Sequence, residues 1–189
     1  MGIDEVGRGP LAGPVAVGVI VATRQVLRKF RLIKESKQLS SAQREEWFAR
    51  ITNELSPDLR HSVAFVSALM IDQKGIAHAI RTALARALAD TNVLPNECDV
   101  RLDGGLRAPS AYSRQQTIIK GDEKETTIAM ASVMAKVLRD RRMYALAKKY
   151  PEYGFERHVG YGTAIHIAAI KKYGLLPEHR KSFCRNIRL

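Results

Sequence analysis

Residues 2–15, with the sequence GIDEVGRGPLAGPV, constrain this chain more than any other segment. Consecutive strand side chains point to opposite faces, so Asp4 and Glu5 reach one ion only if the strand ends here and the chain turns. The loop Gly7-Arg8-Gly9 permits that turn and lets a ligand approach the backbone, while its arginine fits a phosphate. The segment predicts a metal site beside a tight loop; the alternative is a solvated acidic pair beside an ordinary connection.

The charge balance points to a polyanionic partner. The chain has 189 residues, which fits one domain, and its 31 Lys and Arg against 19 Asp and Glu give a net charge of +12. The basic residues are spread along the chain, and such a field attracts nucleic acid. This interpretation is favoured over a protein that is merely basic.

Cysteine usage and hydropathy predict the compartment. Cys98 and Cys184 match no zinc spacing and are too few for a disulfide framework, which indicates reduced structural thiols. The longest apolar run, 11–22, is interrupted by glycine and proline and is too short to cross a membrane. Charged residues precede that run, which argues against a signal peptide. The expectation is a cytoplasmic protein without a membrane segment.

The hydrophobic pattern predicts alternating strands and helices. Short apolar or alternating runs predict strands, and runs of helical period predict helices, one opened by a capping box at Ser40 and Gln43 and one capped by Thr163 and ended by Gly174. The expected strands are 1–5, 15–21, 61–67, 98–103 and 116–120, the first two paired as a hairpin, and the expected long helices are 71–90 and 126–150. This order predicts an α/β fold with a mixed central sheet flanked by helices. The best boundary, at Tyr150-Pro151, divides a core of 1–150 from a small helical extension of 151–189.

Two further acids lie at a strand end and in a loop, positions that often carry functional residues. Asp103 ends a predicted strand, and Asp122 lies in a loop before the long helix. With Asp4 and Glu5 they can converge at the mouth of the sheet, where their mutual repulsion would demand cations. A set of oxygen ligands favours Mg²⁺ or Mn²⁺ over zinc.

Together these segments resemble the ribonuclease HII family over almost the whole chain. Five motifs occur in the family's order: GIDEVGRGPLAGPV from Gly2, SKQLS from Ser36, LDGG from Leu102, KGDEKETTIAMASVMAKVLRDR from Lys120, and YGFERHVGYGTAIH from Tyr153 through HRKSF at His179. The resemblance implies a ribonuclease H-like fold and a substrate of RNA paired with DNA. It also implies a monomeric metal-dependent endoribonuclease.

The resemblance implies a two-ion reaction at the four carboxylates Asp4, Glu5, Asp103 and Asp122. One ion lowers the pKa of the attacking water and the other stabilises the departing 3′ oxygen. The implied substrates are RNA–DNA hybrids and DNA duplexes that contain single ribonucleotides. Cleavage on the 5′ side of the ribonucleotide would leave a 3′-hydroxyl and a 5′-phosphate.

The resemblance also implies which residues bind the substrate. The backbone of Gly7, Arg8 and Gly9 would sense the ribose 2′-hydroxyl, which alone distinguishes RNA from DNA at one nucleotide. Tyr161 would pack near the RNA–DNA junction; without the resemblance it reads as a core aromatic residue. Expected phosphate contacts are Ser36, Lys37, Lys136, Arg139 and Arg180. The spacing of His158, His166 and His179 fits no metal-ligand pattern and predicts structural roles.

Departures from the family pattern leave alternatives open. Glu35 replaces the usual aspartate, Gly105 replaces a common asparagine, and only three residues precede Asp4. A strand that begins at Met1 leaves Asp4 near a fraying end, which predicts a longer natural chain or a modest metal affinity. The enzymatic alternative is the related ribonuclease HIII, which differs by an N-terminal domain and a glutamate as fourth acid. The other alternative is a catalytically silent nucleic-acid-binding module.

Overall fold

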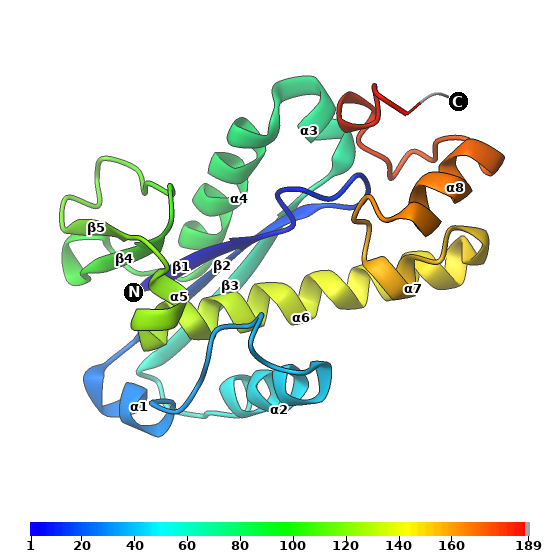
Figure 1. Cartoon of the computed structure of the whole chain (residues 1–189). Coiled ribbons are helices and arrows are strands. Elements are labelled where there is room, and N and C mark those ends of the chain that lie inside the picture. Colours follow the sequence, from blue (N-terminus) through cyan, green and yellow to red (C-terminus); the bar gives the residue numbers. More distant parts are fainter. Residues whose placement is uncertain (188–189) are drawn as a thin grey trace.

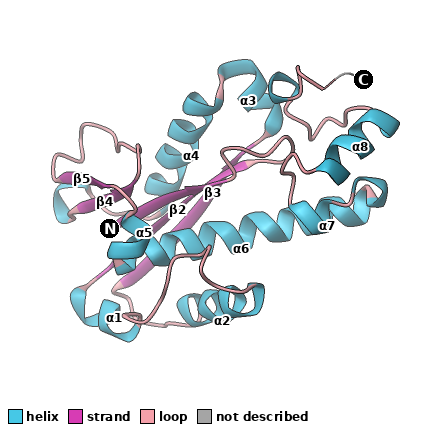
Figure 2. Cartoon of the chain, in the orientation of Figure 1, coloured by secondary structure: helices cyan, strands magenta, loops and turns pink. Residues whose placement is uncertain are grey.

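A five-stranded mixed sheet forms the centre of the protein (Figure 2). The computed structural model describes residues 1–187. The sheet order is β3-β2-β1-β4-β5, in which β1 pairs antiparallel with β2 and β2 with β3, whereas β4 is parallel to β1 and β5 to β4. The strands are β1 (Gly2–Val6), β2 (Val15–Ala22), β3 (Leu59–Val66), β4 (Val100–Asp103) and β5 (Gln115–Ile118).

Helices cover both faces of this sheet (Figure 1). Helices α3 and α4 lie on one face, α6 with α1 and α2 on the other, and α7 and α8 gather at one end of the molecule. The helices are α1 (Arg24–Lys29), α2 (Ser41–Thr52), α3 (Ala68–Lys74), α4 (Ile76–Asp90), α5 (Gly121–Lys124), α6 (Thr126–Lys149), α7 (Phe155–His158) and α8 (Ala164–Tyr173), with short 3₁₀ turns at Pro95–Glu97, Pro151–Tyr153 and Lys181–Phe183.

Alternation along β2 separates two hydrophobic cores. Val17 and Val19 point into the core beneath α4, and Ile20 points into the core beneath α6, because neighbouring strand residues face opposite sides. A third cluster joins Ala12 and the end of α6, at Met143, to the C-terminal elements. Both sheet faces are buried, which is why β2 is continuously apolar.

Helix α6 lies unusually close to the sheet because glycines face it. A Cβ atom added to Gly18 on β2 would lie 2.5 Å from the backbone oxygen of Ala131, and one added to Gly2 would meet the backbone of Thr127. Such distances leave no room for any side chain at either position. These two glycines therefore set the separation between α6 and the first two strands.

The predicted α/β class and mixed sheet are confirmed, with one helix divided. The hairpin, the capping box at Ser40 and the Thr163 cap all form. The predicted helix 71–90 is wrong as one unit, since Gly75 adopts φ of 80° and separates α3 from α4. Left-handed backbone is accessible to glycine and interrupts the helical hydrogen-bond ladder. Periodicity alone did not reveal this break.

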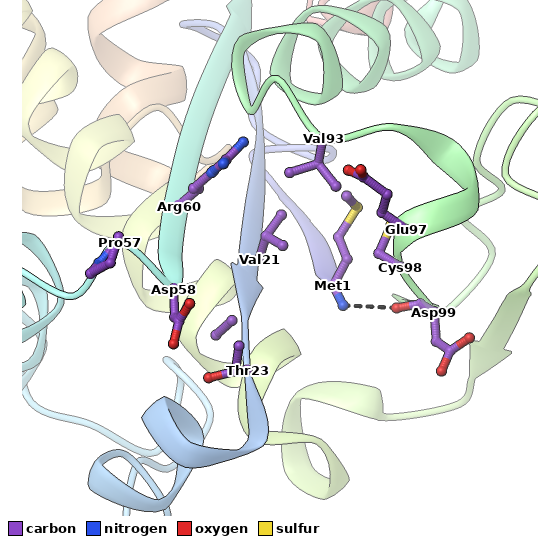
Figure 3. Close-up of a pocket in the computed structure, with 11 residues that line it drawn as sticks. Met1, Val21, Thr23, Pro57, Asp58, Arg60, Val93, Glu97, Cys98 and Asp99 are labelled. Atoms are coloured by element: carbon purple, nitrogen blue, oxygen red, sulfur yellow. Dashed lines mark hydrogen bonds between the residues drawn. The ribbon is translucent and has the colours of Figure 1, made fainter.

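The start of β1 is anchored, contrary to the expectation of a fraying end. The Met1 ammonium group donates to the Asp99 carbonyl at 2.8 Å (Figure 3). Arg101 N donates in turn to the Met1 carbonyl at 2.9 Å. Met1 is also one of the residues that line a cleft of about 420 Å³ beside Val21. Asp4 therefore lies on a strand that pairs with both β2 and β4.

Two further sequence expectations concern thiols and membranes. Cys98 and Cys184 are both free and buried, as expected for structural thiols. Within residues 1–187, none of the helices combines the length and apolar character that crossing a membrane requires.

Replacing Gly18 with alanine should destabilise the protein by about 1–3 kcal/mol, the usual range for overpacking a core. The added methyl group would collide with Ala131 on α6. Gly105→Ala is the matched control, because no atom lies within 4 Å of the added carbon. Chemical denaturation of the three proteins provides the measurement, and equal stability of all three would contradict the close packing of α6.

Candidate active site

Four carboxylates converge where β1 and β4 lie side by side. Asp4 and Glu5 lie near the end of β1, and Asp103 is the last residue of the parallel neighbour β4. Asp122 comes from α5, the single turn that leads into α6. Asp4 is only 5% exposed and Asp122 6%, whereas Glu5 and Asp103 are half-buried. The structure thus brings together the four acids that the sequence singled out.

The four groups act on one another electrostatically. Burial, together with the charges of Glu5, Asp103 and Asp122, raises the pKa of Asp4 to about 8, although a hydrogen bond from Ser132 opposes the shift. Burial also raises the pKa of Glu5, opposed by Arg8. A buried cluster of like charges holds its protons unless a cation compensates it. The raised pKa values of Asp4 and Glu5 therefore favour their protonated forms until a cation compensates the charge.

Local contacts hold each carboxylate. Asp4 Oδ1 accepts from the backbone N–H of Glu5 at 2.8 Å, and Asp103 Oδ1 accepts from that of Gly121 at 2.7 Å. Arg8 Nη1 lies 3.4 Å from Glu5 Oε1.

Asp122 is held at the edge of the cluster. Its carboxylate lies 4.0 Å from Lys37 Nζ, and its pKa is raised by burial and then by Glu35. The helix turn that carries Asp122 is fixed through the Gly121 amide, so the acids of β4 and α5 are linked through the backbone.

The donor set fits a hard divalent cation. Glu5 Oε2 is buried and, among the side chains of residues 1–187, is the buried polar atom that lacks a hydrogen-bond partner. A buried carboxylate oxygen without a hydrogen-bond partner lowers the stability of the folded protein unless a ligand binds to it. All four side chains offer oxygen, which Mg²⁺ and Mn²⁺ prefer. In residues 1–187 no three acids, histidines or cysteines already surround a common point, so the side chains must adjust as a cation enters.

Two buried arginines support the glycine loop that follows β1. Both Arg139 and Arg180 are fully buried, and their guanidinium groups donate only to backbone carbonyls. Arg139 donates to Pro14 at 3.0 Å, Val159 at 3.0 Å and Ala12 at 3.3 Å, and Arg180 donates to Gly13 at 3.0 Å, Arg8 at 2.9 Å and Gly7 at 2.6 Å. The five donors of a guanidinium suit such a set of acceptors.

The expectation that Arg139 and Arg180 contact phosphate directly is therefore wrong. Their side chains face the protein interior, where six carbonyl oxygens replace water around the two charges. Burial lowers the pKa of Arg180 to about 10, so it stays charged at neutral pH. The basic spacing on α6 indicated an exposed face, but it could not show that one of these residues lies beneath a loop.

The other expected phosphate contacts divide by exposure. Ser36 is buried and its hydroxyl shares a hydrogen bond of 2.9 Å with Ser132, so this hydroxyl is engaged inside the protein, and the phosphate contact at Ser36 stays a prediction. Lys136 pairs with Asp140 at 2.8 Å, one turn along α6. Lys37, whose side chain is 82% exposed, lies at the edge of the carboxylate cluster.

The arginine contacts orient the peptide groups of the glycine loop. The carbonyls of Gly7 and Arg8 point inward to Arg180. Because a trans peptide directs its N–H opposite to its carbonyl, the following amides, those of Arg8 and Gly9, point away from Arg180. Gly7 has φ of 88° and no room for a Cβ beside Arg139, which explains the glycine. The loop thus presents two backbone donors on the face opposite its buried support.

Tyr161 lies against this loop. Its side chain is 45% exposed, and its ring comes within 4.0 Å of where a Cβ on Gly9 would stand. The carbonyl of Gly160 accepts from Leu11 N at 2.8 Å and from Ala12 N at 3.3 Å, which joins the tyrosine turn to the loop. The core-aromatic alternative for Tyr161 does not fit this exposure.

Sequence reasoning missed one residue of the site. Ser132 on α6 bonds Ser36 and also reaches Asp4. Its only signal is a hydroxyl group within an apolar run on the buried face of α6, which does not identify a partner.

Comparisons with known proteins agree with this arrangement. The family model described as Ribonuclease HII matches residues 1–186. Ribonuclease HII of Halalkalibacterium halodurans is 44% identical over 96% of this chain and 66% of its own length, and that of Clostridioides difficile is 44% identical over 98% and 70%. The chain therefore spans about two thirds of the length of these relatives.

A solved structure shows the same fold. The crystal structure of ribonuclease H2 from Pyrococcus horikoshii OT3 matches with a TM-score of 0.75 and 27% identity, covering 98% of this chain and 95% of the other. The fold is thus ribonuclease H-like, as the sequence resemblance implied. With a family model that spans nearly the whole sequence and relatives above 40% identity, the chain belongs to the ribonuclease HII family of ribonuclease H endonucleases.

Proposed function

We propose that this chain hydrolyses RNA in RNA–DNA hybrids and cuts duplex DNA on the 5′ side of single embedded ribonucleotides. The products would be a 3′-hydroxyl and a 5′-phosphate. The observation that carries the proposal is the buried carboxylate cluster, with its unbonded Glu5 Oε2, directly beside a glycine loop. The relatives named Ribonuclease HII support the same class of activity.

Asp4, Glu5, Asp103 and Asp122 would hold two divalent ions, Mg²⁺ or Mn²⁺. When bound, such ions lower the pKa of an attacking water and stabilise the oxygen that leaves. The protein's own part is to hold the four oxygen donors near one another, with Asp4 and Asp122 buried so that little solvent screens their charges.

Selectivity for a ribonucleotide would come from the loop beside the carboxylates. The outward amides of Arg8 and Gly9 can bond a 2′-hydroxyl, and the absence of a side chain on Gly9 lets the sugar approach. The exposed face of Tyr161 would then pack against the neighbouring sugar. Residues 151–189 would thus act as a substrate-contacting extension of the catalytic core 1–150.

The remaining substrate contacts would be phosphates. Lys37 and the half-buried Lys136 are the remaining basic candidates, since neither Arg139 nor Arg180 reaches the surface. Phosphate contacts position a duplex without reading its sequence. A DNA duplex with one ribonucleotide, incubated with Mg²⁺ and then Mn²⁺, tests the proposal, and binding without cleavage would identify a silent module instead.

Asp103→Asn should reduce cleavage of both substrates by about 10³-fold or more, because ion catalysis contributes several kcal/mol. Duplex binding should stay within a few-fold, since the basic surface is unchanged. Glu123→Gln is the matched control, an exposed acid next to Asp122 that should keep full activity. Gel assays of cleavage and binding provide the measurement; an active Asp103→Asn would contradict the two-ion assignment.

In the ion-free protein, stability should fall as pH rises from about 4 to about 8. The folded state raises the pKa of Asp4 from 3.8 to about 8, so the stability that its protonated form contributes is lost as pH passes through this range. Asp4→Asn should therefore melt ~2–4 °C above wild type at pH 8 without ions. This is the shift that a gain of about 1 kcal/mol in the free energy of unfolding produces in a chain of this size.

Mg²⁺ should remove this difference by stabilising wild type at pH 8 much more than the variant. Melting temperatures at pH 5 and pH 8, with and without Mg²⁺, measure the effect. Identical pH profiles for the two proteins would show that Asp4 does not belong to a proton-holding, cation-accepting cluster.

Tyr161→Ala should depress cleavage at a single embedded ribonucleotide about 100-fold, the cost of a small misplacement of reacting groups. Cleavage of a continuous hybrid should fall much less, because a long hybrid offers many binding registers. Tyr144→Ala serves as the control, because it removes a similarly exposed tyrosine that lies elsewhere, on α6. An equal loss of rate on both substrates would mean that Tyr161 supports the fold or general binding only.

A further inference from the structure

Three histidines form a buried stack behind the tyrosine turn. His158, His166 and His179 are all buried, and the ring centroids lie 4.4 Å apart for the first two and 5.2 Å for the last two. The Nε2 atoms of His166 and His179 are 3.1 Å apart. Two ring nitrogens at this distance share one proton, which constrains the protonation of both rings.

The outer contacts fix where that proton resides. His166 Nδ1 lies 2.9 Å from the Tyr161 carbonyl, so it carries a proton and donates. His179 Nδ1 accepts from Leu176 N at 2.8 Å, so it carries none. In neutral rings His179 Nε2 then donates to His166 Nε2, and every ring nitrogen is satisfied. Burial lowers the pKa of both histidines to about 4, in agreement with neutral rings.

The pair bridges two parts of the candidate site. At one end His166 holds the carbonyl of Tyr161. At the other, His179 forms a β-bridge with Ala12, and its neighbour Arg180 holds the carbonyls of Gly7 and Arg8. The two histidines therefore fix the tyrosine turn relative to the glycine loop through hydrogen bonds rather than apolar contact alone.

We propose that His166 and His179 are positioning residues for ribonucleotide selection. This histidine pair, joined by one shared hydrogen bond, acts through the Tyr161 turn. The inference rests on the proposed function for its catalytic readout but not for its structural one. The histidine pair would not touch the substrate. It sets the backbone carbonyl of Tyr161, and through it the angle at which the exposed ring meets the loop at Gly9.

The first test uses the protein without substrate. His166→Phe fills the same space between the Phe155 and His179 rings but cannot bond the Tyr161 carbonyl. Amide hydrogen exchange at Tyr161 and Thr163 should accelerate about 10-fold or more, as expected for loss of a buried hydrogen bond, while exchange in β2 stays unchanged. Unchanged exchange at the turn would overturn the proposal whatever the enzyme cleaves.

The second test is a double-mutant cycle on cleavage. His166→Phe should lower the rate at an embedded ribonucleotide about 10-fold and the rate on a continuous hybrid less than 2-fold, as for a small misalignment. In a Tyr161→Ala background the same change should have almost no further effect, because the two residues act as one unit. Equal effects on both substrates, or full additivity with Tyr161→Ala, would overturn the proposal.

A variant and a spectroscopic reading cover poor folding of His166→Phe. His179→Asn keeps an acceptor for Leu176 N but loses the donor to His166, so it should show the same selective loss. Nitrogen NMR of the wild type should show His166 protonated at Nδ1 and His179 at Nε2 near pH 7. The opposite tautomers would overturn the proposal for the histidine pair. A wild-type protein that cuts no ribonucleotide would refute only the proposed function.

Discussion

The close contact between α6 and the first two strands determines the rest of the site. Because Gly2 and Gly18 lack side chains, α6 rests on the backbone of β1 and β2. One helix can then reach Asp4 through Ser132 and, two turns later, the glycine loop through Arg139. With α6 this close to the sheet, Arg139 donates three hydrogen bonds to the backbone carbonyls of Pro14, Val159 and Ala12.

Buried charges of opposite sign lie next to each other along the chain without neutralising each other. The carboxylates gather at the end of β1, and the two guanidinium groups lie beneath the loop that follows it. Each group is stabilised by its own means, the arginines by carbonyl dipoles and Asp4 by retaining a proton. This separation leaves the carboxylates free to accept cations, and it leaves a positive field close to where a bound phosphate would lie.

The sequence was informative where local rules govern structure. Caps at Ser40 and Thr163, alternation in the strands and the glycine-rich turn depend on neighbours within a few residues, and these predictions are confirmed. The convergence of the four acids followed from strand ends meeting at one edge of a sheet. Arg139 and Arg180 could not be placed this way, because a basic residue looks the same in the sequence whether it faces water or a carbonyl-lined loop.

The C-terminal contacts show why such residues escape local reasoning. Arg180 bonds Gly7 and Arg8 across more than 170 positions of sequence, and its own N–H donates to Leu11 at 2.7 Å. A loop held by such distant partners can adopt its shape only after the two ends of the chain have met. Forming these contacts is slow, because the entropy lost in closing so long a loop is not offset until the contacts have formed. The glycine loop therefore takes its shape from long-range contacts. Its geometry depends on the histidine and arginine contacts of residues 151–187 as much as on its own glycines.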